Sequence, residues 1–303
     1  MKRVLLRPTA DLVFKRIFGK EKEIAIEFIN LFINPPKPVV DITFLEQEMP
    51  ADLRDGKVSV VDIRCTDSNN QHFILEMQVV HHEGFLDRQL LYACKAYAMQ
   101  FLSGVKYSDR QTVYLLTIID KEIIPDTTLW LHPFAVRHEE LNHISIPGLH
   151  MRVLELGKRK KLGNFNMENA SDRWMAFLAE PEKLITMPKF DISVYPNLMK
   201  AVDLLDRSNF TMAQQIAYDN HLFAVADINQ SRMESFDQGY DEGLEKGINT
   251  GKIAGIQEGL EKGLQLSIAI YKELQSGILS DEEIALKYSI TVTEVEQLAK
   301  EFE

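Results

Sequence analysis

Two neighbouring segments, Lys57–Asp67 and His72–Val80, constrain the fold most strongly. Both are rich in β-branched and other apolar residues, and the five residues between them, DSNNQ, have the length and composition of a β-hairpin loop. Pairing Thr66 with His72 across this loop places Asp62 directly opposite Glu76. The sequence therefore predicts an antiparallel hairpin that brings two carboxylates together.

This register divides the hairpin into two faces, because successive side chains of a strand point to opposite sides. One face is wholly apolar and is predicted to lie against the core: Val61, Ile63, Leu75, Met77 and Val79. The other face is predicted to be solvent-facing and to carry a polar cluster: Val60, Asp62, Arg64, Ile74, Glu76 and Gln78. A shift of one residue would separate Asp62 from Glu76, so the prediction depends on this register.

Two carboxylates in this position repel each other. Their Cβ atoms would lie about 5 Å apart, and at an effective dielectric constant near 20 the repulsion is roughly 3 kcal/mol. A divalent cation such as Mg²⁺, bound by Asp62 and Glu76, would offset it and supply waters for hydrolysis. An ion-pair cluster with Lys57, Arg64 or Arg88 would offset it equally well. The residues alone leave both arrangements open.

The segments around the hairpin predict an α/β core within about the first 125 residues. Apolar residues at helical spacing predict a short helix with Thr9 as its N-cap and, after Gly19, a longer helix that the prolines of Asn34–Val40 end. The other predicted elements are strands at 39–49, 57–67, 72–80 and 111–120 and a helix at 85–104.

We predict three regions along the chain: residues 1–165 with the α/β core and a mixed extension that ends in the strand His150–Leu156, residues 166–235 as a helical region, and residues 236–303 as a tail.

Only Cys65 and Cys94 are present, which is too few for a disulfide framework. No apolar run reaches the length of a membrane span. We therefore expect a cytoplasmic protein that does not associate with membranes.

The combined motifs resemble a known family. The motifs are DLVFKRIFG (Asp11–Gly19), VVDIRC…FILEMQ with Lys57 ahead of Asp62, DRQLLYACKAY, LELGK and the glycine-periodic tail. Together they resemble the Rpn-type recombination-promoting nucleases, also called PD-(D/E)XK family transposases. The resemblance implies a restriction-endonuclease-like fold and Mg²⁺-dependent hydrolysis of DNA phosphodiester bonds. It also implies that Asp62 and Glu76 hold the metal and that Gln78 takes the place usually held by lysine.

Gln78 departs from the usual pattern of such nucleases. A lysine there could neutralise charge on the phosphate and help to deprotonate the attacking water, whereas a glutamine only donates and accepts hydrogen bonds. Lys57 or Lys15 could supply the missing charge from a neighbouring element. Two alternatives to the enzyme therefore stay open: a DNA-binding protein that keeps the fold without turnover, and an oligomeric interaction protein.

Further polar residues have two interpretations each. Asp11, in the first helix, would lie near the metal or would only favour the helix N-terminus through the macrodipole. His81 and His82 would touch a metal or phosphate or would form a polar end to the strand. One helical face would contact phosphates or bases, or would be solvated: Arg88, Tyr92 and Lys95.

The net charge of −11 is unevenly distributed. Residues 231–303 carry 15 acidic and 7 basic side chains, so the first three quarters of the chain are nearly neutral. A basic run, GKRKKLG (Gly157–Gly163), could therefore feed a local DNA-binding groove or could be a solvated loop.

Seven glycines recur at every fourth position of the tail, from Gly239 to Gly263. Each costs about 1 kcal/mol relative to alanine within a helix, so a compensating contact is needed. A glycine ridge lets another backbone approach closely, which predicts a homo-oligomer or intramolecular packing through this helix, with a flexible acidic linker as the alternative. Ser280–Glu283 and Thr293–Glu296 match capping boxes and predict two short acidic helices suited to protein docking.

Overall fold

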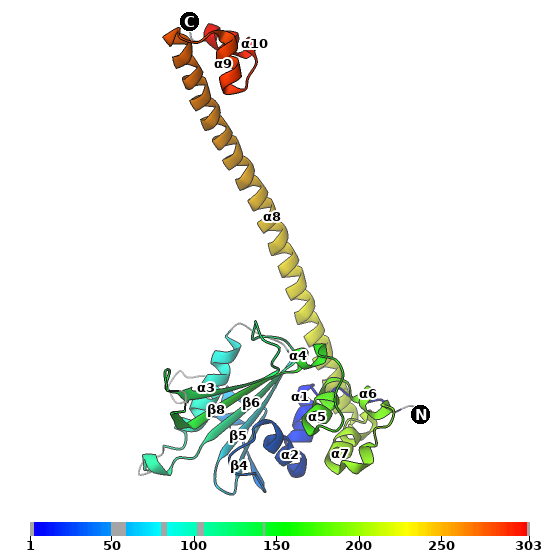
Figure 1. The fold of residues 1–303 in the computed structure, drawn as a ribbon. Helices are drawn as coiled ribbons and strands as arrows, with labels where there is room; N and C mark the ends of the chain where they lie inside the picture. Colours follow the sequence, from blue (N-terminus) through cyan, green and yellow to red (C-terminus); the bar gives the residue numbers. More distant parts are fainter. Residues whose placement is uncertain (1–2, 50–58, 80–83, 102–105, 142, 302–303) are drawn as a thin grey trace. The chain divides into compact units, whose positions relative to one another are not determined.

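The computed structural model describes residues 3–49, 59–79, 84–101, 106–141 and 143–301 (Figure 1). The chain divides into two compact units, Met1–Asn229 and Gln230–Glu303, and each is described by itself.

A mixed six-stranded sheet forms the centre of the first unit (Figure 1). Its strands, in spatial order, are β1 (Ile42–Leu45), β4 (Ile63–Asp67), β5 (His72–Gln78), β6 (Val113–Ile119), β8 (Ser145–Glu155) and β7 (Leu131–Arg137). β5, β6 and β8 run parallel to one another, while the other neighbours pair antiparallel. β2 (Glu48–Met49) and β3 (Ser59–Val60) form a separate two-stranded ribbon. The predicted α/β fold, with a mixed sheet flanked by helices, is confirmed.

The predicted hairpin register is also confirmed. Thr66 lies opposite His72, and Ile63 lies opposite Leu75, across β4 and β5. β6 is buried along its whole length, as expected for a central parallel strand with helices on both faces.

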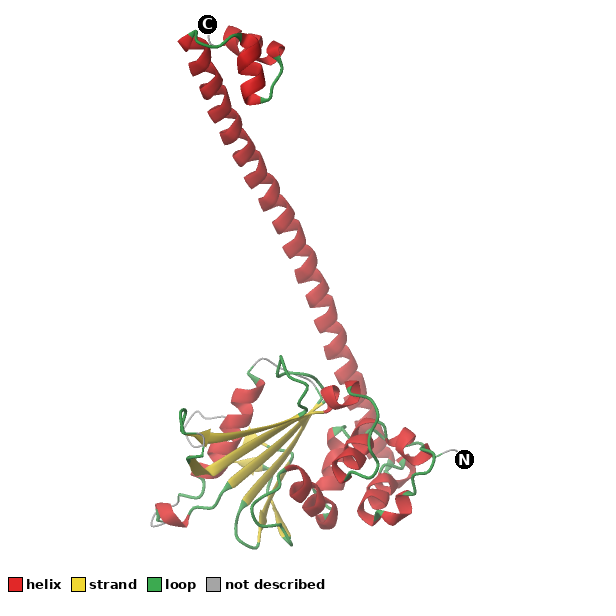
Figure 2. Cartoon of the chain, viewed as in Figure 1, coloured by secondary structure: helices red, strands yellow, loops and turns green. Residues whose placement is uncertain are grey.

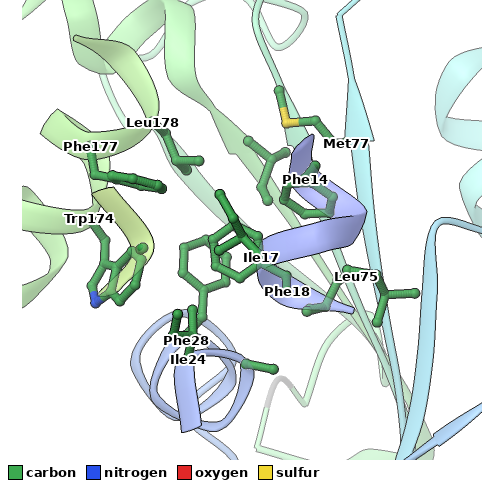
Figure 3. Packing of buried hydrophobic residues seen from close by; sticks show 14 of the residues in the cluster. Phe14, Ile17, Phe18, Ile24, Phe28, Leu75, Met77, Trp174, Phe177 and Leu178 are labelled. Carbon is green, nitrogen blue, oxygen red and sulfur yellow. The ribbon is translucent and has the colours of Figure 1, made fainter. Parts of the chain in front are cut away.

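One face of the sheet is covered by α1 (Asp11–Phe18), α2 (Lys22–Phe32) and α5 (Ala170–Ala179), with α7 (Pro196–Leu204) packed against them. Figure 3 shows Phe14 and Phe18 of α1 between the strand residues Leu75 and Met77 and the α5 residue Trp174. The rings of Phe18 and Phe28 lie 4.6 Å apart between centroids. This aromatic cluster holds α1 on the sheet and so fixes the position of its polar residues.

α1 begins one residue later than the predicted N-cap implies. Ala10, not Thr9, occupies the cap position, and the helix has no side-chain cap. The carbonyl of Ala10 accepts hydrogen bonds from the amides of Val13 and Phe14. Thr9 is buried, so its side chain packs inward and does not close the helix end.

The opposite face of the sheet is covered by α3 (Phe85–Ala98), which corrects the solvent-facing prediction. Ala93 and Ala96 of α3 pack with Ile74, Val113 and Leu115 in a second core. The short side chains of α3 let the helix lie close to the strands, and this contact buries the hairpin face that carries Glu76.

The predicted strand over 57–67 is interrupted. A bend at Asp62 separates β3 from β4, and Val61 joins the second core instead of lying beside Ile63 in the first. Strict alternation fails at this point because the chain leaves one ribbon and enters the sheet.

The basic run forms α4 (Leu156–Lys161), so the prediction of a loop is wrong. Each of its four cations lies within salt-bridge distance of a carboxylate: Lys158 of Glu155, Arg159 of Asp172, Lys160 of Asp120 and Lys161 of Glu122. Lys158 and Arg159 are buried. The run is therefore a helix with paired cations and not a solvated loop, while its contribution to a DNA-binding groove stays a prediction.

α6 (Pro181–Thr186) follows α5, and α8 (Met212–Ser276) begins in the first unit and continues as one helix into the second (Figure 2). At its far end, α9 (Asp281–Tyr288) and α10 (Val292–Glu301) pack on α8 through Ile270, Ile284, Ala285 and Val295. Ser280 and Glu283 form the predicted capping box of α9. The box of α10 is formed by Thr291 and Glu294, two residues before the predicted pair, because α10 begins at Val292.

All seven tail glycines lie within α8, so the flexible-linker alternative is wrong. A Cβ atom built at any of them would meet no other atom of the described chain within 4 Å, so the intramolecular-packing alternative is not observed either. In the part of the chain that the structure describes, no helix is both long enough and apolar enough to cross a membrane.

Candidate active site

Four charged side chains from three elements meet at one end of the hairpin. Asp11 and Lys15 come from α1, Asp62 from the bend before β4, and Glu76 from β5. The Lys15 ammonium lies 2.7 Å from Asp11 Oδ1 and 3.4 Å from Asp62 Oδ1. Lys15 therefore bridges the helix carboxylate and the hairpin carboxylate, and the structure brings together three of the five predicted site residues: Asp11, Asp62 and Glu76.

Backbone hydrogen bonds fix the two hairpin carboxylates. The amide of Asp62 donates to Glu76 Oε1 at 3.0 Å, and the amide of Met77 donates to Asp62 Oδ2 at 2.8 Å. The side-chain amide of Gln47 donates to the carbonyl of Asp62 at 2.6 Å. Glu76 thus accepts a hydrogen bond from the backbone of the bend, and Asp62 accepts one from the backbone of β5. The two bonds together hold the bend at Asp62 against β5.

Both carboxylates are poorly compensated. Glu76 is 5% exposed, and burial, together with the charge of Asp62, raises its pKa to about 8. Burial also raises the pKa of Asp62 to about 6, although the Met77 amide and Lys15 act against the shift. Burial alone would lower the pKa of Lys15, but Asp11 and Asp62 outweigh it and the pKa is raised. The positive groups present do not neutralise this pair of acids.

Gln78 receives its cation from α3. Arg88 Nη2 donates to Gln78 Oε1 at 2.5 Å, so a guanidinium lies directly beside the Gln78 side chain. Arg88 Nε and Gln89 Nε2 are buried and have no hydrogen-bond partner among the described residues. Gln89 accepts from Thr117, and Thr117 lies directly opposite Glu76 in the sheet. Two donors close to the carboxylates therefore lack an acceptor.

The donor set fits a hard divalent cation. Carboxylate oxygens are its preferred ligands, and the raised pKa values of Asp62 and Glu76 mark negative charge that a cation would stabilise. No group of three or more His, Cys, Asp or Glu side chains suited to a metal occurs among the described residues. A site with two carboxylates suits Mg²⁺, which keeps several waters and meets substrate phosphates, better than it suits a cation that needs an all-protein cage.

Other candidates from the sequence lie elsewhere. Lys57, His81 and His82 fall outside the described residues. Arg64 donates to the carbonyl of Glu46 at 3.1 Å and so turns away from the carboxylates. On α3, Lys95 contacts Ser59 Oγ at 2.9 Å.

Two parts of this arrangement escaped the sequence analysis. The bond between Arg88 and Gln78 joins residues of different elements, and no local pattern indicates it. Gln89 had a detectable signal, because it shares helical spacing with Ala93 and Ala96 and is therefore a polar residue in the apolar stripe of α3.

Comparison with known proteins adds one match. The family model described as PD-(D/E)XK nuclease family transposase matches residues 8–234. No curated protein and no solved structure matches the chain. The matched range contains α1, the whole sheet and α3, and with them every described residue of the candidate site.

Proposed function

The chain belongs to the PD-(D/E)XK nuclease family transposases, and on this premise we propose that it is a Mg²⁺-dependent DNA endonuclease that acts in recombination or on mobile elements. The observation that carries the proposal is the pair Asp62 and Glu76 at one end of the hairpin, where Glu76 is buried, Asp62 is partly buried, and both have raised pKa values. Buried acids without sufficient counter-charge are costly to the fold, and a metal site offsets that cost.

In this proposal Asp62 and Glu76 hold the cation. When bound, the cation supplies positive charge to the scissile phosphodiester and lowers the pKa of a water molecule. The hydrogen bonds from the amides of Asp62 and Met77 orient the two carboxylates before the substrate arrives.

Gln78 and the neighbouring cations have complementary roles in the proposal. Arg88 donates to Gln78 Oε1 and so orients the side-chain amide, whose nitrogen acts as a donor toward the attacking water. In the proposal Arg88 carries, beside Gln78, the positive charge that Gln78 lacks and that would stabilise a bound phosphate. Asp11 holds the ammonium of Lys15 close to Asp62.

Incubation with supercoiled plasmid DNA tests the proposal. Nicked and linear DNA should appear with Mg²⁺, should be absent with excess EDTA, and should reappear when Mg²⁺ exceeds the chelator. Cleavage that persists in EDTA would contradict the metal requirement. Retention of DNA without cleavage at any Mg²⁺ concentration would favour the alternative, a nuclease-fold DNA-binding protein.

Arg88 should matter through its charge. We expect Arg88→Ala to reduce the single-turnover cleavage rate by about 10- to 100-fold, since a preorganised cation facing the phosphate is lost. Adding Gln78→Lys to Arg88→Ala should recover much of that loss by returning a cation to the strand. Lys37→Ala, which removes an exposed cation elsewhere in the first unit, is the control. An unchanged rate in Arg88→Ala would contradict this role.

We also propose that the chain forms homo-oligomers through α8. From residue 231 to residue 266 every side chain of α8 is exposed, so the chain itself contributes no packing there. An exposed apolar residue directly follows most of the glycines: Tyr240, Leu244, Ile248, Ile256, Leu260 and Leu264. A second copy would bury this row and offset the roughly 7 kcal/mol that seven glycines cost the helix.

Substitution of the glycines separates assembly from helix stability. The triple variant Gly243→Leu, Gly251→Leu and Gly259→Leu should stabilise the helix by about 1 kcal/mol per position, yet should block close approach and lower the mass in solution. A Cβ atom at each of these glycines would have nothing within 4 Å outside the backbone of its own helix, and every neighbouring side chain is exposed, so an intrachain clash does not explain the loss. Asn249→Leu, off the glycine row, is the control. An unchanged mass with increased helicity would reject the proposal.

A further inference from the structure

A second cluster of basic side chains lies in the first unit, on strands β7 and β8. Arg137, His150 and Arg152 line a cavity of about 230 Å³ together with Tyr114 of β6. Its other walls include Asn34 and Pro36, which follow α2, and Pro133 of β7. None of the candidate active-site residues lines this cavity.

The strands place these side chains together. His150 lies opposite Tyr114 on one side and Ala135 on the other. The rings of His150 and Tyr114 are stacked, with centroids 5.3 Å apart and an interplanar angle of 17°. Arg152 is two residues further along β8 and shares the face of His150. The pairing of β7 shifts register between Ala135 and Arg137, a local irregularity of the kind that re-aims a side chain.

Among the described residues, no carboxylate is paired with this cluster. Arg137, His150 and Arg152 have no hydrogen bond or salt bridge to a carboxylate within the described ranges. Burial lowers the pKa of Arg152. Burial, with the charges of Arg152 and Arg137, also lowers the pKa of His150. The contrast with α4 is informative, because all four cations of that helix are paired.

The fold itself compensates only a part of this charge. α2 ends at Phe32, next to the cavity, and a helix C-terminus contributes the equivalent of about half a negative charge. Two guanidinium groups, which are always protonated, exceed this. The partly buried Arg152, with the exposed Arg137 beside it and no paired anion, is costly to the fold, so the cavity is better suited to a bound anion than to water alone.

We propose that this cavity binds a phosphate group. Two guanidinium groups on neighbouring strands match the several oxygens and the negative charge of a phosphate group, and arginine binds it in a bidentate manner. The same chemistry is offered by a phosphodiester of a nucleic-acid strand and by a small phosphorylated molecule. The proposal does not depend on cleavage at Asp62 and Glu76.

Binding should be linked to the protonation of His150. The charged or titratable groups that face it are Arg137 on β7, Arg152 on β8 and Tyr114 on β6, while the wall after α2 contributes only the uncharged Asn34. A bound phosphate places negative charge beside the imidazole and raises its pKa, so phosphate should bind more tightly as the pH falls.

The test uses NMR of the ring signals of His150 in the full-length protein. His150→Gln identifies them among the eight histidines. Inorganic phosphate is titrated in one series, and a single-stranded oligonucleotide without terminal phosphates in another. We expect the signals to shift and the pKa of His150 to rise on binding. Arg152→Gln should weaken binding at least about tenfold, as expected for loss of a charge-assisted hydrogen bond.

Further variants make the outcome decisive. Arg137→Gln alters an exposed side chain, so it should keep the fold while also weakening binding. Lys189→Gln removes an exposed cation that does not line the cavity and should change nothing. A response to inorganic phosphate supports a small-anion site, and a response to the oligonucleotide alone supports a backbone-phosphate site. No shift with either ligand, or equal binding by wild type, Arg137→Gln and Arg152→Gln, would overturn the inference.

Discussion

Replacement of Asp62 by Asn, or of Glu76 by Gln, should reduce the cleavage of plasmid DNA by at least about a thousandfold, because each change removes a carboxylate proposed to hold the divalent cation. Both substitutions keep the size of the side chain. The amide oxygen that each introduces can also still accept the backbone hydrogen bond that orients the native carboxylate. The measurement is the single-turnover rate constant at saturating Mg²⁺, with DNA binding recorded separately.

Two controls make this result interpretable. Asp41→Asn removes an exposed carboxylate outside the site and should leave the rate unchanged. The double variant should lose little more than either single variant, because residues that act as one unit give non-additive losses. Cleavage at the wild-type rate by both single variants would indicate a contaminating nuclease or a different site.

In the absence of divalent cations, the free energy of unfolding should fall as the pH rises from about 5 to about 8. The pKa of Glu76 is raised from 4.5 to about 8 by burial, and then by Asp62. Between these values the native state keeps a proton that the unfolded state has released. The contribution of Glu76 to the free energy of unfolding is therefore fully present below its pKa in the unfolded state, 4.5, and is lost as the pH rises through its pKa in the folded state, about 8. Asp62, whose pKa is raised from 3.8 to about 6, contributes in the lower part of the range.

Glu76→Gln should remove most of this pH dependence and raise the free energy of unfolding at pH 8 by about 2–4 kcal/mol, because a neutral amide replaces a buried charge. Urea denaturation in EDTA across the pH range measures both effects, with Asp41→Asn as the control for removal of a carboxylate. Mg²⁺ should stabilise the wild-type protein more at pH 8 than at pH 5, since it binds the ionised pair, and should affect Glu76→Gln little. An identical pH slope in wild type and Glu76→Gln would contradict this account.

Activity and stability should change in opposite directions in Glu76→Gln, which separates function from folding. This variant is expected to be inactive and more stable, whereas a substitution that merely damages the fold would be inactive and less stable. A site that is costly to its own fold is common where acids are gathered for catalysis.

Local pattern was enough for several features of this chain. The length of the DSNNQ loop and the alternation on either side of it led to the observed pairing of Thr66 with His72. Helical spacing located α1 and α3, and the Ser280–Glu283 motif located the start of α9. These features depend on neighbours close in sequence, so the residues that decide them can be compared directly.

Features that depend on distant partners were missed or wrong. The hairpin face that carries Glu76 was expected to meet solvent, but α3 covers it. The pairing of the basic run was missed, because its cations meet carboxylates up to 40 residues away, and the run is a helix where a solvated loop was one of the two expectations. Val61 changed sides because the chain bends at Asp62 as it passes from one sheet to another.

By itself, then, the sequence determined the order of the elements, the pairing of the hairpin, and the placement of two acids across it, since strand alternation and loop length act over a few residues. Only the tertiary structure decided that Glu76 is buried and Asp62 partly buried, that Lys15 joins Asp11 to Asp62, and that Arg88 bonds to Gln78. The physical reason is that burial and charge compensation arise only when α1 and α3 pack on opposite faces of the sheet. The periodicity of one segment shows which of its faces is apolar, but it does not show which other segment will cover that face.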